Sequence, residues 1–264
     1  MPVEPRPAAS VLLVRSGARA PLECYLIRRA REMRFLGGYY AFPGGKVDLA
    51  DRTAEALARV DGITPEAAAA RLGTSGEVPP LAYWLAAIRE LFEETGVLLA
   101  VDSAGRPVDP AREDLAGRLE AHRRAVVGGE RSFPAILAAE GWRADARPLV
   151  YLCHFVTPPS SPIRFSARFF LCRLPRGQAP RLILEEASAG LWVPPAEAHA
   201  RFGAGEWKMA EPAEYGTQYL AQFESEAALW AHHADGQAKF DGIIDRLDAA
   251  RHYRFDWDTV VRRG

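Results

Sequence analysis

The sequence predicts an α/β protein, because segments of strand length alternate with segments that have helical periodicity. Residues 11–14 and 22–28 are short apolar runs typical of strands, whereas apolar residues between 81 and 97 recur every three or four positions, as on a buried helix face. The chain has 264 residues, of which 48% are hydrophobic and 25% charged, so it can bury a large core. We expect one elaborated domain spanning residues 1–264.

The first part of the chain predicts two strands that lead into a glycine-containing segment. A turn-rich stretch, 16–21, joins the two N-terminal strands. The segment Phe-Pro-Gly-Gly-Lys-Val-Asp follows at 42–48, and its two glycines permit a tight turn or a close approach to a ligand. Further on, Thr64 and the proline after it favour a short helix over residues 65–72.

The second half of the chain continues the alternation of strands and helices. Strands are predicted at 97–101, 149–156 and 165–174, and two further segments, 182–186 and 191–193, surround residues 187–190. Helices are predicted at 109–127, 132–140 and 195–202. Beyond Trp207, apolar residues recur at helical spacing, so we expect a helical C-terminal extension over about 205–264 that caps the sheet or forms a homodimer contact. The aromatic residues of 253–257 are expected to dock this extension onto the rest of the protein.

The helix predicted between Pro80 and Gly96 carries a cluster of carboxylates. Glu90 and Glu94 lie four residues apart with Glu93 beside them, so their side chains project from one flank of a single turn. Three like charges repel each other there, and they also oppose the helix macrodipole. A divalent cation that prefers oxygen ligands would offset the repulsion. The alternative is a solvated acidic face with the neighbouring arginine as its ion-pair partner.

Residues 89–97, Arg-Glu-Leu-Phe-Glu-Glu-Thr-Gly-Val, together with the glycines at 44 and 45, resemble the signature of the Nudix hydrolase family. The second half of that signature reads Arg-Glu-aliphatic-X-Glu-Glu-X-Gly-aliphatic, and the sequence matches it at every specified position. The first half departs twice: Asp51 stands where the family has glutamate, and 37 residues separate it from Arg89 where the family usually has seven. A flexible loop lengthened to this extent costs only about 1.5 kcal/mol of closure entropy. We expect helices within this insertion, at about residues 52–80.

Interrupted signatures of this kind occur in a Nudix subgroup that includes peroxisomal coenzyme A diphosphatases, and residues 35–51, 156–158 and 164–171 are similar to that subgroup as well. The resemblance implies a Nudix-type α/β/α sandwich with a mixed sheet. It also implies metal-dependent hydrolysis of the diphosphate linkage in a nucleoside diphosphate derivative, with coenzyme A or acyl-coenzyme A as the first expectation. ADP-ribose, NADH and nucleoside triphosphates are alternative substrates. A non-catalytic, nucleotide-sensing module is an alternative of another class.

The resemblance further implies roles for individual residues. The ligands of Mg²⁺ or Mn²⁺ would be Glu90, Glu93, Glu94 and the carbonyl of Gly45. The catalytic group would comprise Arg89, which orients the carboxylates, and a general base that is Glu90, Glu185 or Glu186. An anionic substrate is expected beside residues that precede or belong to the glycine segment, namely Arg28, Arg34, Phe42 and Gly44. For the arginines a solvated basic connection is the alternative; for Phe42, core packing is favoured over stacking on the base of a substrate.

Other features of the sequence exclude several classes of protein. The net charge is −1, so bulk electrostatics favour neither a nucleic-acid partner nor a membrane surface. No apolar run is long enough for a signal peptide or a membrane span, and the last residues are not a peroxisomal Ser-Lys-Leu signal, so a cytoplasmic location is predicted. Cys24, Cys153 and Cys172 are expected to be reduced core residues rather than reactive thiols or a disulfide. His154 is expected to be packed and hydrogen-bonded rather than to face a substrate.

Overall fold

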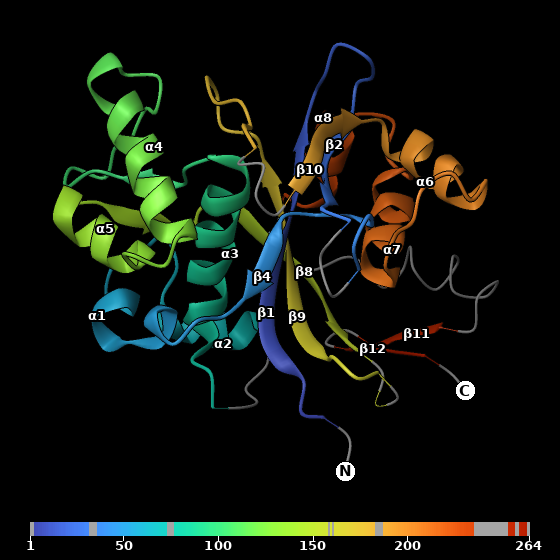
Figure 1. Cartoon of the computed structure of the whole chain (residues 1–264), viewed down its shortest axis with the longest axis horizontal. Helices are drawn as coiled ribbons and strands as arrows, with labels where there is room; N and C mark the ends of the chain where they lie inside the picture. Colours follow the sequence, from blue (N-terminus) through green and yellow to red (C-terminus); the bar gives the residue numbers. More distant parts are fainter. Residues whose placement is uncertain are drawn as a thin grey trace.

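The main β-sheet has nine strands and separates two groups of helices (Figure 1). The computed structural model describes residues 3–31, 36–72, 77–157, 159, 161–182, 187–234, 253–256 and 259–262. Seven strands follow the order β10-β2-β1-β9-β8-β12-β11, while β3 pairs with β2 and β4 with β1. Their bounds are β1 Arg6–Arg15, β2 Glu23–Arg29, β3 Tyr40–Ala41, β4 Gly44–Lys46, β8 Leu149–Val156, β9 Phe165–Arg173, β10 Ala187–Val193, β11 Tyr253–Asp256 and β12 Thr259–Arg262. Two pairs, β1 with β9 and β12 with β8, are parallel and the others antiparallel, so the sheet is mixed, as predicted.

Helices cover both faces of this sheet, which gives the expected α/β/α layering. The first group lies on one side and comprises α1 Ala54–Leu57, α2 Pro65–Leu72, α3 Pro80–Thr95, α4 Glu113–Val127 and α5 Phe133–Glu140. The second group covers the opposite face and comprises α6 Pro195–Gly203, α7 Glu211–Leu220 and α8 Glu226–His232. β1 shows why two cores form: Val11 and Leu13 pack toward the first group, and the alternate residues Leu12 and Val14 toward the second.

Helix α3 is buried along most of its length because the sheet covers one flank and the surrounding helices cover the rest. Trp84, Leu85, Ile88 and Leu91 are fully buried, and the Trp84 ring lies 5.0 Å from the ring of Phe170 on β9. The helix ends at Gly96, which has φ +72°, a left-handed conformation that favours glycine. The carboxylates of its last two turns are therefore held on a rigid element.

The insertion within the signature is helical, as predicted, but it also contains a strand. Besides α1 and α2 it contributes β5 (Val60–Asp61), which pairs in parallel with β7 (Arg143–Asp145), and β7 in turn pairs with β6 (Ala100–Val101). These three strands form a second, small sheet. The buried Leu72 of α2 packs in the same core as α3. The insertion is thus integrated into the protein rather than looped out from it.

Three expectations differ from the structure. β1 begins at Arg6, ahead of the predicted residue 11, because its first half pairs with β4 and β9. Helix α4 begins at Glu113, since the Asp109 carboxylate accepts a hydrogen bond from Ala111 N and forms a turn there. The C-terminal extension predicted as helical over about 205–264 contains α7 and α8, but it also contains a hairpin of β11 and β12 that extends the sheet beside β8. The helical pattern predicted around residues 240–247 lies outside the described residues.

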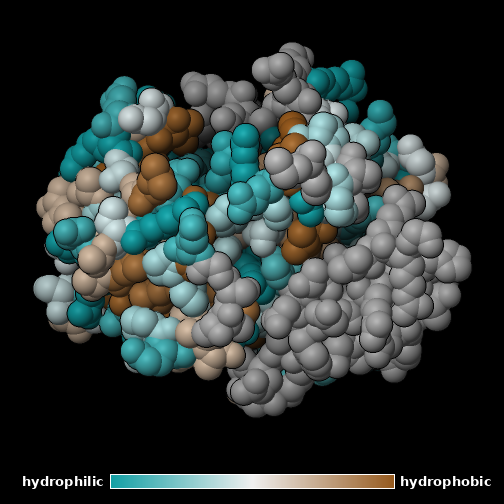
Figure 2. All heavy atoms as spheres, turned by 90° about the horizontal axis from the view of Figure 1, so that it is seen from below, coloured by the Kyte–Doolittle hydropathy of each residue, from teal (hydrophilic) through white to brown (hydrophobic). Residues whose placement is uncertain are grey.

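The described surface is mixed in polarity. On the face shown in Figure 2, hydrophobic patches are bordered by hydrophilic residues. Among the described residues, the large hydrophobic side chains that are exposed are Val3 and Leu49. No described helix combines the length with the apolar character that crossing a membrane requires.

Candidate active site

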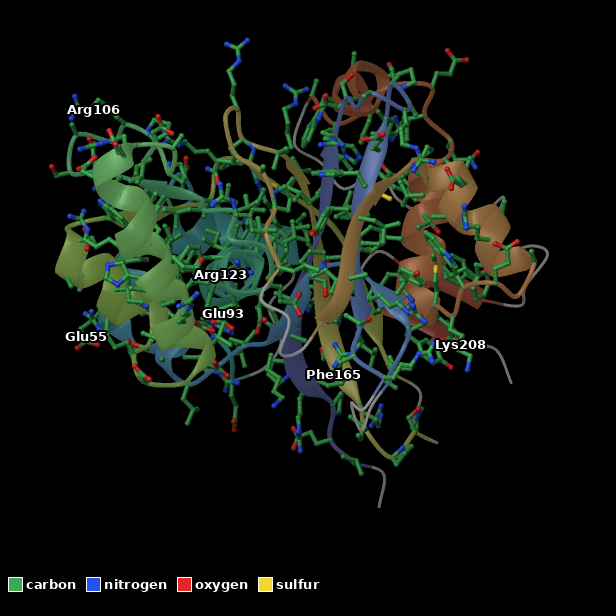
Figure 3. All side chains as sticks on the ribbon, turned by 45° about the horizontal axis from the view of Figure 1, so that its top comes forward. Glu55, Glu93, Arg106, Arg123, Phe165 and Lys208 are labelled. Atoms are coloured by element: carbon green, nitrogen blue, oxygen red, sulfur yellow. The ribbon has the colours of Figure 1, made fainter. Side chains whose placement is uncertain are left out.

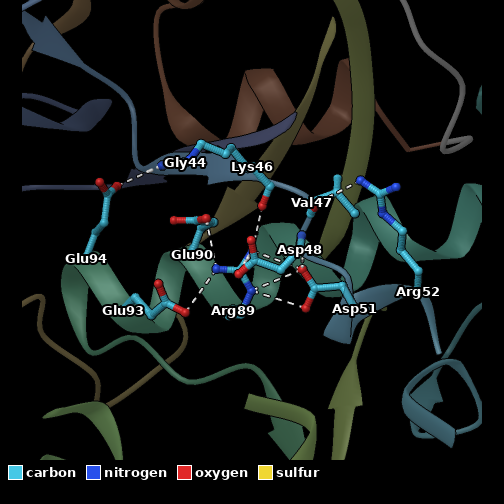
Figure 4. Close-up of polar contacts among 10 residues, drawn as sticks. All are labelled: Gly44, Lys46, Val47, Asp48, Asp51, Arg52, Arg89, Glu90, Glu93 and Glu94. Atoms are coloured by element: carbon cyan, nitrogen blue, oxygen red, sulfur yellow. Dashed lines mark hydrogen bonds and ion pairs between the residues drawn. The ribbon is translucent and has the colours of Figure 1, made fainter. Parts of the chain in front are cut away.

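Arg89 is the hub that joins the two halves of the signature (Figure 4). Its side chain is 5% exposed, and its Nε and Nη2 atoms donate to Asp51 at 3.0–3.2 Å. The Nη1 atom donates to one oxygen each of Glu90 and Glu93, at 2.9 and 3.0 Å. Nη2 also donates to the Lys46 carbonyl at 2.6 Å. Arg89 therefore contacts the carboxylates that it is predicted to orient.

Asp51 has a larger part in the site than the departures from the family signature suggested. It lies in a 3-10 turn, Ala50–Arg52, and is fully buried. Burial raises the pKa of its carboxyl, and the charge and hydrogen bonds of Arg89 act in the opposite direction. One of its oxygens also accepts a hydrogen bond from Asp48 N. The insertion that follows Asp51 therefore does not disturb the ion pair of Asp51 with Arg89.

Glu90 and Gly45 fit against each other so closely that residue 45 has no room for a side chain. A Cβ atom at Gly45 would lie 2.3 Å from Oε1 of Glu90. Burial raises the pKa of the Glu90 carboxyl, Arg89 lowers it, and the charges of Glu93 and Glu94 raise it further. Burial likewise raises the pKa of Glu93, again opposed by Arg89. Both glutamates would gain from a further positive charge beside them.

Glu94 turns toward the same loop from the next turn of α3. One of its carboxylate oxygens accepts a hydrogen bond from Gly44 N at 2.8 Å. Gly44 itself lies close to β1, because a Cβ there would be 2.5 Å from the Ala9 carbonyl oxygen. Glu90 and Glu94 therefore face the two adjacent glycines of β4, as the sequence predicted for the carboxylate flank.

The negative charge of this site exceeds the positive charge that contacts it. Asp51, Glu90 and Glu93 contact Arg89 directly, and Asp48 lies 3.6 Å from its Nη2. Carboxylate oxygens are the ligands that Mg²⁺ and Mn²⁺ prefer, and the absence of a side chain at residue 45 leaves the Glu90 carboxylate against main chain. The donor set therefore fits a hard divalent cation. Among the described residues, no three His, Cys, Asp or Glu side chains are arranged as a metal-binding group; Glu90 and Glu93 share Nη1 of Arg89, and Glu94 accepts a hydrogen bond from Gly44 N.

The residues predicted to contact substrate do not form one group. Arg28 lies on β2 with its guanidinium 5.8 Å from the Tyr40 ring, and Tyr40 stacks on Trp207 at 4.1 Å. Phe42 is 5% exposed and belongs to the core beside α7, where a Cβ at Gly216 would lie 2.5 Å from its ring. Phe42 thus packs in the core, which the sequence favours over stacking on the base of a substrate. Arg34, Glu185 and Glu186 lie outside the described residues.

The segment that leads toward Glu185 and Glu186 is fastened to the C-terminal end of α3. Gln178 exchanges two hydrogen bonds with the main chain of Leu98, at 2.8 and 2.9 Å. Arg181 N donates to the Thr95 carbonyl at 2.7 Å. The chain therefore runs past the end of the carboxylate helix shortly before it reaches these two glutamates.

Two of the other sequence expectations are confirmed. Cys24, Cys153 and Cys172 are buried and free. His154 is 7% exposed, and its Nε2 lies 2.7 Å from the Ser166 hydroxyl, so it is packed and hydrogen-bonded. Neither the thiols nor this histidine lies among the contacts of Arg89.

Comparison with known proteins identifies related chains along most of this sequence. Residues 5–220 match the family model described as the NUDT19 Nudix domain. The acyl-coenzyme A diphosphatase NUDT19 of Gallus gallus is 30% identical over 265 residues, covering 83% of this chain and 69% of that protein. The human acyl-coenzyme A diphosphatase NUDT19 is 27% identical over 234 residues, covering 76% of this chain and 60% of that protein. The chain thus spans 60% to 69% of the length of these relatives.

A solved structure shows the same fold. The crystal structure of a NUDIX hydrolase from Alicyclobacillus acidocaldarius superposes with a TM-score of 0.70 and is 31% identical in sequence. The superposition covers 89% of this chain and 98% of that one. The likeness therefore extends beyond the signature to the arrangement of sheet and helices.

Proposed function

The chain belongs to the Nudix hydrolase family as a pyrophosphohydrolase, and on that premise we propose that it cleaves the diphosphate linkage of coenzyme A or an acyl-coenzyme A in the presence of Mg²⁺ or Mn²⁺. The observation that carries the proposal is the end of α3, where Glu90 and Glu94 lie against the two glycines of β4 and Arg89 holds Glu90 and Glu93. Relatives named acyl-coenzyme A diphosphatases support this choice of substrate.

The glutamates and Arg89 have different roles in the proposed reaction. Glu90, Glu93 and Glu94 would hold the cation, and Arg89 fixes the carboxylates of Glu90 and Glu93 before it binds. When bound, the cation supplies charge neutralisation for the diphosphate and makes a water molecule easier to deprotonate. The proton of the attacking water would pass to a carboxylate, for which Glu90, Glu185 and Glu186 are the candidates.

The substrate alternatives share the diphosphate and differ in the groups attached to it. ADP-ribose, NADH and nucleoside triphosphates would meet the same carboxylates, so the cluster alone does not choose among them. A cytoplasmic location and a homodimer remain predictions from the sequence. A nucleotide-sensing module without hydrolysis is the competing function, but it gives no reason for three glutamates to cluster on this part of α3.

The proposal is tested by offering the purified chain coenzyme A, acetyl-coenzyme A, ADP-ribose and NADH, each with Mg²⁺, with Mn²⁺ or with EDTA. Products are identified by mass spectrometry, and adenosine 3′,5′-bisphosphate is the expected product from both coenzyme A substrates. We expect turnover of these two to exceed that of the others and to stop in EDTA. Turnover of ADP-ribose or NADH alone would assign that nucleotide as the substrate instead of coenzyme A. Binding without turnover of any nucleotide would favour the sensing module.

A further inference from the structure

Arg123 of α4 reaches the carboxylate turn from outside the signature (Figure 3). Its side chain crosses to α3, where Nε donates to the main-chain carbonyl of Glu93 at 2.8 Å. Arg123 is 2% exposed, whereas its neighbour Arg124 keeps 74% of its side chain exposed and pairs with Glu120 on the same helix. Two successive arginines of α4 thus differ sharply in their surroundings.

The end of α3 is shaped around the Arg123 guanidinium. A Cβ atom at Gly96 would lie 3.2 Å from Nη1 of Arg123, and the φ of +72° at this residue disfavours a side chain independently. The guanidinium lies beside the last turn of the helix, where main-chain carbonyls concentrate partial negative charge and a cation is stabilising. The glycine of the signature therefore ends the helix and also leaves room for Arg123.

The burial of Arg123 is costly, so its charge must be offset by something in its surroundings. Burial lowers the pKa of its guanidinium, while the charges of Glu120, Tyr25 and Glu94 act in the opposite direction. Its buried Nη2 has no hydrogen-bond partner among the described residues. An apolar side chain would fill this space at lower cost, which argues against a role in packing alone.

We propose that Arg123 is a positioning residue for the divalent cation: it holds the main chain of Glu93 and sets positive charge beside Glu94, so that both carboxylates are placed before the cation binds. The inference rests on the proposed function. Because Arg123 is buried and donates to the main chain, it acts through Glu93 and Glu94 and not by contact with the nucleotide. Substitution of a residue that supports metal ligands without touching the metal typically changes metal affinity by 10- to 100-fold.

The test compares Arg123→Gln and Arg123→Lys with Arg124→Gln, the matched control on the same helix. Mn²⁺ binding is measured without nucleotide from the electron paramagnetic resonance signal of the free ion, and thermal unfolding is recorded for each variant. We expect Arg123→Gln to weaken Mn²⁺ binding about 10- to 100-fold and Arg123→Lys to weaken it less, because lysine keeps the charge and loses the planar donor. Arg124→Gln should bind Mn²⁺ as the wild type does.

A folded Arg123→Gln variant with wild-type Mn²⁺ affinity would overturn the inference. If this variant does not fold, Arg123→Lys decides: weakened binding with unfolding like that of the wild type supports the inference, and unchanged binding overturns it. Failure of the underlying function looks different, since the wild-type protein itself would then neither bind Mn²⁺ nor hydrolyse a nucleotide.

Discussion

Individual side chains of the site are bound to one another by charge before any ligand arrives. Arg89 joins Asp51, Glu90 and Glu93, so a change at one carboxylate alters the balance at the others. Glu94 differs from these residues in that one of its oxygens accepts a hydrogen bond from Gly44 N. Substitutions at Glu94 and at Asp51 should therefore have different consequences.

Glu94→Gln is expected to lower kcat/KM by at least about 100-fold with little effect on stability. The glutamine oxygen can still accept the hydrogen bond from Gly44 N, and one of three repelling charges on the turn is lost. Initial rates with the best substrate and a thermal unfolding curve check both parts. Glu55→Gln on α1, an exposed site, is the control, and full activity of Glu94→Gln would remove this residue from the site.

Asp51→Asn is expected to lower the free energy of unfolding by about 3 kcal/mol, because it breaks a buried ion pair and leaves Arg89 short of one carboxylate. Asp48→Asn serves as the comparison: its side chain is 59% exposed and lies 3.6 Å from the same guanidinium, so we expect a change below about 1 kcal/mol. Urea unfolding measures both values. Equal effects at the two positions would contradict the importance given to burial.

Some residues of the site could be predicted from the sequence and others could not. The common flank of Glu90, Glu93 and Glu94 follows from helical geometry; the structure places Glu90 and Glu94 against the glycine loop and Glu93 on Arg89. Asp51 departs from the signature in residue type and in spacing from Arg89, which weakens its assignment from sequence, but distance along the chain says little about distance in space. No local pattern in the sequence distinguishes Arg123. Two successive arginines on a polar helix predict a solvated face, and only the packing of α4 against α3 shows that one of them is buried.

At the scale of elements, the insertion is a structural part of the protein. Its strand β5 completes the small sheet with β7, and its helix α2 packs against α3. The helices of the insertion were predictable from proline, threonine and alanine placement. The two-residue strand was not, because its pairing partner lies more than 80 positions further along the chain.

Leu72→Ala in α2 is expected to lower the free energy of unfolding by about 2–4 kcal/mol, because this side chain is 3% exposed within the core around α3. Leu49→Ala should change it by less than about 0.5 kcal/mol, since that side chain is 79% exposed. Chemical denaturation of both variants tests the comparison. A neutral Leu72→Ala would show that the insertion is dispensable to the fold.

At the scale of the whole molecule, three buried thiols link stability to pH. Burial raises the pKa of Cys24 and Cys172 to about 12, and that of Cys153 well above its ordinary value. The folded chain therefore keeps these protons at pH values where the unfolded chain, with thiol pKa near 8.5–9, has lost them. Stability is fully present below about pH 8.5 and falls as pH rises toward 12, by about 1.4 kcal/mol per pH unit for each thiol.

The measurement is the free energy of unfolding between pH 8 and pH 11 for the wild type and Cys172→Ala. We expect the slope of the variant to be shallower by about 1.4 kcal/mol per pH unit above pH 9.5, even though the loss of the side chain lowers its stability at every pH. Parallel curves would mean that Cys172 ionises equally in both states. Comparison of the two slopes removes the contributions that tyrosines make to both proteins.

The hairpin at the far end of the chain has a consequence for how copies of the protein meet. With β12 laid against β8, the outermost strand on that margin is β11, only four residues long, and the opposite margin ends in β10, whose register is interrupted between Ala187 and Ala189. Short or irregular edge strands offer few unpaired amides and carbonyls with which a strand of a neighbouring molecule could pair. A second copy would therefore associate through packing against helices more readily than through extension of the β-sheet.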